Sequence, residues 1–199
     1  LYTVKMNGQA IGYAQTRLDT VPQGFVFSDR IILDVPSLGE THRASAQTSV
    51  NLSPTLDLQK FSFQLGSEIG VFNVDGVVGA DSVLHLELDA GGKLQKSTMQ
   101  MRPGLLLDGV IPIRLAAGGQ LEVGQKMTTF VFNPSVMADQ QVEMSVTATD
   151  TLIVPDSARY DTPTKRWVVS SYDTIPVWRV EQTFGGITIG SWVDDDGHL

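Results

Sequence analysis

A turn signal recurs about every ten residues through most of this 199-residue chain. Each signal carries proline, glycine or aspartate, and the stretches between the signals alternate apolar with polar residues. Such short alternating stretches are typical of antiparallel strands that follow one another in an up-and-down meander. The sequence therefore predicts an all-β fold. The signals are Pro22-Gln23-Gly24, Ser53-Pro54, Gly66-Ser67, Gly79-Ala80-Asp81 and Gly91-Gly92.

The alternation also predicts a sheet with one apolar and one wet face. Phe61, Phe63 and Leu65 fall on one face, whereas the residues between them are polar. The stretch from Phe25 to Val35 keeps this alternation for so long that its strand would measure ~35 Å. A strand of that length favours a wide curved sheet or half-barrel over a compact sandwich. The other expected strands cover residues 2–6, 11–18, 41–52, 56–65, 69–78, 83–88, 94–101, 127–132 and 141–154.

Both ends of the chain carry hairpin signals built on glycine. Asn7-Gly8 follows the first expected strand, and Gly185-Gly186 joins Val177–Phe184 to Ile187–Val193. Glycine and asparagine accept the positive φ angles that tight hairpin turns require. In the last hairpin the alternation is regular except at Gln182, which interrupts the apolar face. A polar loop, Pro155 to Thr164, precedes this final meander in our interpretation.

The strand pattern breaks once, between Pro103 and Gly119. Proline near the start and glycine just past the end of 112–118 are typical of a short helix. The preceding segment is apolar almost all round, which a surface helix would not tolerate. We therefore expect residues 103–119 to form a short helical plug on the apolar concave face of the sheet. The plug either borders a ligand cavity or is filled, dry core, and its candidate ligand-lining residues are Leu105, Leu106, Leu107, Val110 and Ile111.

Composition limits the partners of the chain. Its net charge is −8 with a pI of about 4.7, so that the chain would repel the phosphates of a nucleic acid. It has no cysteine, which excludes disulfides, thiolate metal sites and cysteine nucleophiles. No apolar run approaches the ~20 residues of a transmembrane segment. A length of 199 residues fits one β-rich domain, residues 1–199.

No catalytic or metal-binding motif is present. His42, His85 and His198 lie far apart, without the spacing of a zinc site. Asp194-Asp195-Asp196-Gly197 resembles a calcium loop only superficially, because Trp192 stands where the first ligand should be, and an Asp-Gly turn explains it better. The glutamates are scattered. We therefore predict no catalytic residue, no metal, no cofactor and no enzymatic activity.

Three segments carry a family resemblance. The opening, residues 2–13, is similar to the start of exported bacterial β-domains that follow a signal peptide. Arg179 to Gly197 resembles their closing hairpin, and Leu121–Gln125 with Phe130–Pro134 resembles a segment between these ends. Such domains precede transglutaminase-like cysteine-peptidase cores, and their organisation is similar to the periplasmic lipoprotein-carrier half-barrel. The catalytic Cys, His and Asp of that core have no counterpart in this chain.

The resemblance implies a periplasmic or otherwise exported bacterial protein. We expect a non-catalytic, envelope-associated accessory or binding domain, with a C-terminal transglutaminase-like domain or an envelope protein as its partner. The alternative is a carrier that holds an apolar ligand in a half-barrel cavity. Because turn chemistry at Asp195-Asp196-Gly197 is followed by only His198 and Leu199, we also expect the chain to be a fragment whose next strand begins there.

Overall fold

The computed structural model describes residues 2–6, 8–37, 40–68, 70–119, 121–184, 186–195 and 197. Within them the chain forms thirteen strands, one 3₁₀ helix and one short α-helix, which confirms the all-β prediction. Two compact units are present: Leu1–Ile111 with Thr129–Gln141, and Pro112–Thr128 with Val142–Leu199. A single domain 1–199 and a continuation past Leu199 stay predictions. Some predictions rest on residues outside the described ranges. They are the turns at Asn7 and Gly185, the strand start at Ile69, the Asp-Gly turn at Asp196, and the predictions for His198 and Leu199.

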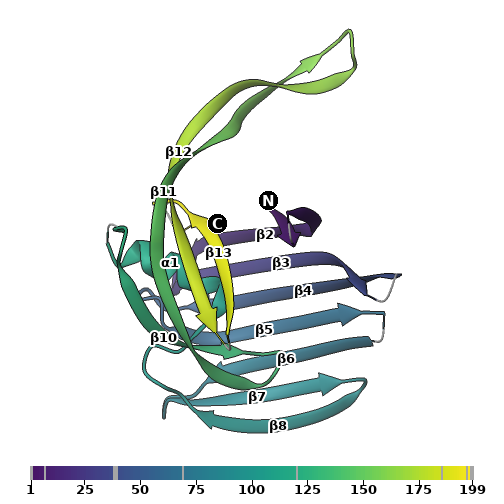
Figure 1. Ribbon diagram of the computed structural model, residues 1–199. Coiled ribbons are helices and arrows are strands. Elements are labelled where there is room, and N and C mark those ends of the chain that lie inside the picture. The colour runs from purple at the N-terminus through teal and green to yellow at the C-terminus, as the bar shows by residue number, and fades with distance from the viewer. Residues whose placement is uncertain are drawn as a thin grey trace. The chain divides into compact units, whose positions relative to one another are not determined.

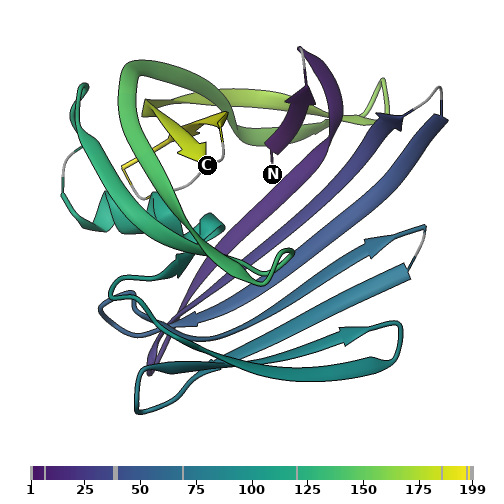
Figure 2. The same ribbon diagram turned by 60° about the horizontal axis from the view of Figure 1, so that its bottom comes forward.

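The first unit contains an eight-stranded antiparallel sheet in which every strand pairs with its neighbours in sequence. Figures 1 and 2 show these strands side by side in chain order. The sheet does not close, because β1 and β8 are its two edges. The predicted up-and-down meander is therefore confirmed. Its strands are β1 (Tyr2–Met6), β2 (Gln9–Val21), β3 (Gly24–Ser37), β4 (Glu40–Leu52), β5 (Leu58–Ser67), β6 (Gly70–Val78), β7 (Val83–Ala90) and β8 (Lys93–Gln100).

The register aligns the apolar residues of neighbouring strands into rows on one face, as the alternation predicted. One row runs across five strands through Phe27, Val50, Phe61, Gly76 and Leu86. Its four side chains are buried. Glycine is required at position 76 by packing, because a Cβ there would lie 2.1 Å from the Phe61 ring. We call this set of residues the buried row.

The segment from Leu105 to Ile111, which follows β8, covers part of the buried row, and we call it the covering segment. Gly109 lies against Phe27, since a Cβ on it would be 2.8 Å from that ring. Gly109 belongs to the 3₁₀ helix η1 (Asp108–Val110), which follows the short strand β9 (Leu106–Leu107). Strand β9 pairs in parallel with β10 (Lys126–Asn133). From β10, the Phe132 ring packs against Phe61 with 5.5 Å between centroids.

The predicted plug is thus helical only in its second half. The α-helix α1 (Ile111–Ala117) lies inside the predicted range, but residues 105–107 are not helical and Leu106 and Leu107 form strand β9. The physical reason is that this part is apolar on all sides. An extended segment meets the backbone needs of Leu106 and Leu107 by pairing with β10 and leaves their side chains free to be buried.

The second unit contains most of β11 (Ala138–Asp161), from Val142 onward, together with β12 (Arg166–Phe184) and β13 (Ile187–Val193), and these strands pair antiparallel. The predicted alternation in β12 is confirmed, since Val180 and Gln182 are buried while Arg179 is exposed. Leu115 of α1 and Val180 are both buried and line a hollow of only about 10 Å³, which is too small for a ligand. No helix in the described residues is long and apolar enough to span a membrane.

The polar loop predicted at residues 155–164 is instead the far end of a long hairpin. Strand β11 continues through Pro155 to Asp161 and pairs with β12 up to Arg166. Two register shifts, between Pro155/Ser157 and Ser157/Ala158, bend the ribbon and absorb the proline. The turn itself is held by Asp161, whose carboxylate accepts the backbone N–H of Thr164 at 3.2 Å. Figure 1 shows this part as a two-stranded ribbon.

Candidate functional site

Beside the buried row, the same face of the eight-stranded sheet carries apolar side chains that are only half-buried. They come from β3, β5, β6 and β7, and the register places them in the next two rows across the sheet. Phe63 and Phe72 meet edge to face with 6.4 Å between ring centroids. An apolar area of this kind on an open sheet is a candidate for binding another apolar surface. We call it the apolar strip: Ile31, Phe63, Leu65, Phe72 and Leu88.

One carboxyl group interrupts this face. Asp29 of β3 lies between Phe27 and Ile31 on the apolar side of the strand, opposite Thr16 and Thr48. Within the described residues no lysine or arginine forms an ion pair with it, and its hydrogen-bond partner is the backbone N–H of Arg30. Burial raises the pKa of Asp29 from 3.8 to about 6, the Arg30 hydrogen bond opposes the rise, and the nearby charge of Asp108 adds to it.

Asp108 reaches the same place from the covering segment. It begins η1 and precedes Gly109, which lies against Phe27, so its carboxyl and that of Asp29 repel each other. Burial of the carboxyl raises the pKa of Asp108 as well, although part of the residue remains exposed to solvent. Both carboxyls are therefore protonated more readily than ordinary aspartates, Asp29 mainly because it is buried on the apolar face.

Sequence reasoning missed this pair, but half of it left a signal. In the stretch from Phe25 to Val35 every second residue is apolar except Asp29. A charged residue in the apolar phase of a strand marks either an edge or a functional position. Asp108 left no comparable signal in the sequence, because no local pattern predicts that η1 lies over β3.

The raised pKa of Asp29 predicts how its replacement changes stability with pH. The native state holds the Asp29 proton more tightly than the unfolded state, so ionisation destabilises the fold as pH rises from about 4 through 6. Ionisation of a fully buried group with this pKa would lower the free energy of unfolding by about 3 kcal/mol. Partial exposure lowers the expected value to about 1–2 kcal/mol. The free energy of unfolding of the Asp29→Asn variant, measured with urea, should therefore exceed that of the wild type by this amount at pH 7.5. Below pH 4 the two proteins should be equally stable.

Asp34 of the same strand provides a control of opposite sign. Its carboxylate accepts two hydrogen bonds from the Arg43 guanidinium, at 2.7 and 2.8 Å, and these lower its pKa. The Asp34→Asn variant should lose stability at pH 7.5 and lose none where the wild-type carboxyl is already protonated. Equal effects of Asp29→Asn at both pH values would contradict the burial of Asp29.

The five predicted ligand-lining residues lie together in the covering segment. Their exposed fractions are 0–3%, so each is packed on all sides by protein. Leu106 and Leu107 pair with Val131 and Phe132 of β10. This packing is what filled core requires. That Leu105, Leu106, Leu107, Val110 and Ile111 also line a ligand cavity stays a prediction.

Two larger hollows lie over the opposite, polar face of the sheet. One measures about 360 Å³ and is lined mainly by amide, hydroxyl and carboxylate groups of β4–β7. The other measures about 610 Å³ and borders Val77 and His85. Two polar pairs lie along them, since Gln64 donates to Asn73 at 2.9 Å and Lys96 pairs with Glu87 at 2.9 Å. The polar lining of the 360 Å³ hollow suits water better than an apolar ligand.

The histidines form no metal site in the described part of the chain, where no group of three or more potential ligands gathers. His42 pairs through Nδ1 with Glu68 at 2.9 Å on the surface. His85 lies on the polar face. At the chain's end, the backbone N–H of Gly197 donates to the Asp194 carbonyl at 3.1 Å, the bond of a turn.

An open antiparallel meander of eight strands, with one apolar face partly covered by the chain itself, defines a β-barrel-like protein. No protein-family model and no curated protein matches the sequence. A solved structure of similar fold is the β-barrel-like protein of the domain of unknown function DUF1849 from Brucella abortus. It has a TM-score of 0.59 and 14% identity, over 94% of this chain and 78% of that chain. A DUF1089 protein from Pseudomonas aeruginosa has a TM-score of 0.45 and 14% identity, over 99% and 92% of the two chains.

Proposed function

We propose that this chain is a non-catalytic binding domain that takes an apolar ligand on the apolar strip. The observation that carries the proposal is a group of half-buried apolar side chains, two of them phenylalanines, on one face of an open sheet. Burying a phenylalanine or leucine side chain is worth about 1.5–3 kcal/mol, so contact with several of them supports micromolar binding. Asp29 lies in the same row as Phe63, so binding should be strongest where Asp29 is protonated.

Fluorescence of the apolar probe N-phenyl-1-naphthylamine tests this function. We expect a saturable rise in emission with the wild-type protein and a loss of about tenfold in affinity for Phe72→Gln, since each 1.4 kcal/mol of lost contact is tenfold. The matched control is Val77→Gln, because Val77 belongs to the same strand, is exposed and faces the polar side. Thermal unfolding of both variants verifies that they fold.

The control also separates the two faces. Weaker binding in Val77→Gln, with Phe72→Gln unchanged, would place the probe in the polar-face hollow and end the proposal. Equal binding by all three proteins would do the same.

We further propose that the domain works outside the cytoplasm of a bacterium, as an accessory to an envelope protein such as a transglutaminase-like domain. Support comes from the resemblance of its two ends to exported β-domains. A carrier role is the second candidate, and the exposed part of the apolar strip favours it, since a carrier must release its ligand. Osmotic-shock fractionation of cells that express the native gene tests the location, and cytoplasmic protein alone would refute it.

A further inference from the structure

The tip of the long hairpin exposes aromatic side chains. Tyr160 of β11 and Trp167 of β12 are directly opposite each other, and their rings meet edge to face at 5.7 Å between centroids. Yet 52% of Tyr160 and 71% of Trp167 remain exposed to solvent. Tryptophan is normally among the better-covered residues of a folded protein. We call residues 159–167 the ribbon tip.

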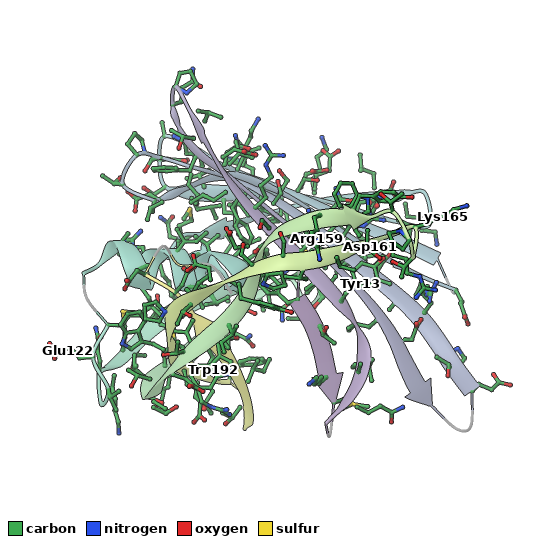
Figure 3. The ribbon with its side chains drawn as sticks, turned by 90° about the horizontal axis from the view of Figure 1, so that it is seen from above. Tyr13, Glu122, Arg159, Asp161, Lys165 and Trp192 are labelled. Atoms are coloured by element: carbon green, nitrogen blue, oxygen red, sulfur yellow. The ribbon has the colours of Figure 1, made fainter. Side chains whose placement is uncertain are left out.

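The ribbon tip also carries charge of the opposite sign to the chain as a whole. It has three basic residues, Arg159, Lys165 and Arg166, and one acidic residue, Asp161, for a net charge of +2 in a chain of −8. Asp161 is engaged by the hydrogen bond from Thr164 that holds the turn. Within the described residues none of the three cations forms an ion pair, and all three are exposed. Figure 3 shows Arg159, Asp161 and Lys165 together at this end of the ribbon.

The fold gives the ribbon tip few strand contacts. Strand β13 pairs with β12 only between Phe184 and Trp178, so the part of β12 before Trp178 pairs with β11 alone. A two-stranded ribbon is marginal by itself in water. The edges are a poor template for another strand, because Pro155 and the two register shifts interrupt them. A partner is therefore not expected to pair with the ribbon as an added β-strand. Instead, a partner of the ribbon tip is expected to bind through its exposed side chains.

We propose that the ribbon tip docks on the surface of an anionic phospholipid bilayer. Tryptophan and tyrosine rings prefer the level of the lipid headgroups, where one side of the ring is apolar and the other wet. Arg159, Lys165 and Arg166 complement the lipid phosphates. Each basic residue near an anionic surface raises the affinity of a protein for the membrane by about fivefold. Pro163 stiffens the turn that holds both sets of side chains. The rest of the chain carries a net charge of −10 and is therefore repelled by anionic headgroups.

Flotation with phospholipid vesicles tests this proposal. We expect the wild-type chain to float with vesicles of phosphatidylglycerol and phosphatidylcholine in equal parts, and about tenfold less with phosphatidylcholine alone. Lys165→Glu with Arg166→Glu should reduce flotation with the anionic vesicles at least tenfold, and so should Tyr160→Ala with Trp167→Ala. Binding to the anionic vesicles should weaken when salt rises from 0.05 to about 0.5 M, because salt screens exposed charges.

Matched variants elsewhere on the surface keep the result specific. Lys60→Glu with Lys93→Glu makes the same change in net charge on exposed lysines of the first unit, and Tyr13→Ala removes a tyrosine that is 47% exposed. Both should float like wild type. Equal flotation of the ribbon-tip variants and these controls would overturn the proposal. Flotation that does not depend on lipid charge would also overturn it, and absence of flotation with either kind of vesicle would favour a protein partner instead.

A second measurement reports on Trp167 itself. Vesicles that contain brominated lipid should quench part of the tryptophan emission of the wild-type chain, and Trp167→Phe should abolish that quenching while Trp178 and Trp192 still emit. Unchanged quenching in Trp167→Phe would mean that another part of the chain meets the lipid. The strip variant Phe72→Gln should float like wild type, because this inference is independent of the apolar ligand.

Discussion

Replacement of Leu106 by aspartate is expected to lower the free energy of unfolding by about 3 kcal/mol or more. Leu106 is 3% exposed and pairs with Val131 in the segment that covers the sheet. A carboxylate at this position would be buried without a cation among the surrounding apolar side chains. Its alternative is to stay protonated at neutral pH, which also costs free energy. Urea unfolding at pH 7.5 measures the loss.

Leu94→Asp is the matched control. Leu94 belongs to β8, is 57% exposed and lies opposite Asp89, so solvent screens the new charge and its change should stay within about 1 kcal/mol. A similar, small loss in both variants would show that the segment from Leu105 to Ile111 is not core. The Leu106 variant should also recover part of its stability at low pH, where the new carboxyl is neutral in both states.

Local rules were enough to predict the sheet. Turn chemistry every ten residues and strict alternation between the turns determine strand length, pairing of sequence neighbours and the face of each side chain. The rows through Phe27 and Phe63 follow directly, since an up-and-down meander leaves no choice of partner. The short helix was also predictable, because Pro112 and Gly118 mark its two ends.

Two parts of the fold depended on longer-range effects. The far end of the hairpin was misjudged as a loop because Pro155 and the polar residues after it disfavour a strand, and only register shifts permit pairing there. The extended form of Leu106–Leu107 was missed because a continuous apolar run has no period to read. Its pairing with β10 joins residues more than twenty positions apart, which no local signal encodes.

The candidate site shows the same division. The alternation placed Phe63 and Leu65 on the apolar face and left Asp29 as an exception on it. The contribution of Asp108 requires knowing that η1 lies over Phe27, which is a tertiary contact. The same contact explains why Asp29 was not recognised as one half of a carboxyl pair.

The aromatic contact that joins β10 to the sheet predicts a second large effect. Phe132 has no solvent-exposed surface and packs on the Phe61 ring at 5.5 Å. Truncation of a fully buried phenylalanine removes its transfer free energy and leaves a cavity, so Phe132→Ala should lose about 3–5 kcal/mol. Phe72→Ala, on the half-buried apolar strip, should lose clearly less.

A double-mutant cycle with Phe61→Ala identifies the source of that loss. Because the two rings touch, the double variant should lose about 0.5–1.5 kcal/mol less than the sum of the single losses. The Phe61 ring also lies against Gly76, where an added Cβ would be 2.1 Å from it. Urea unfolding of the four proteins measures the cycle. Strictly additive losses would show that β10 does not cover the buried row. The burial of Asp29 and the placing of the apolar strip, which both assume that this face is partly covered, would then be wrong.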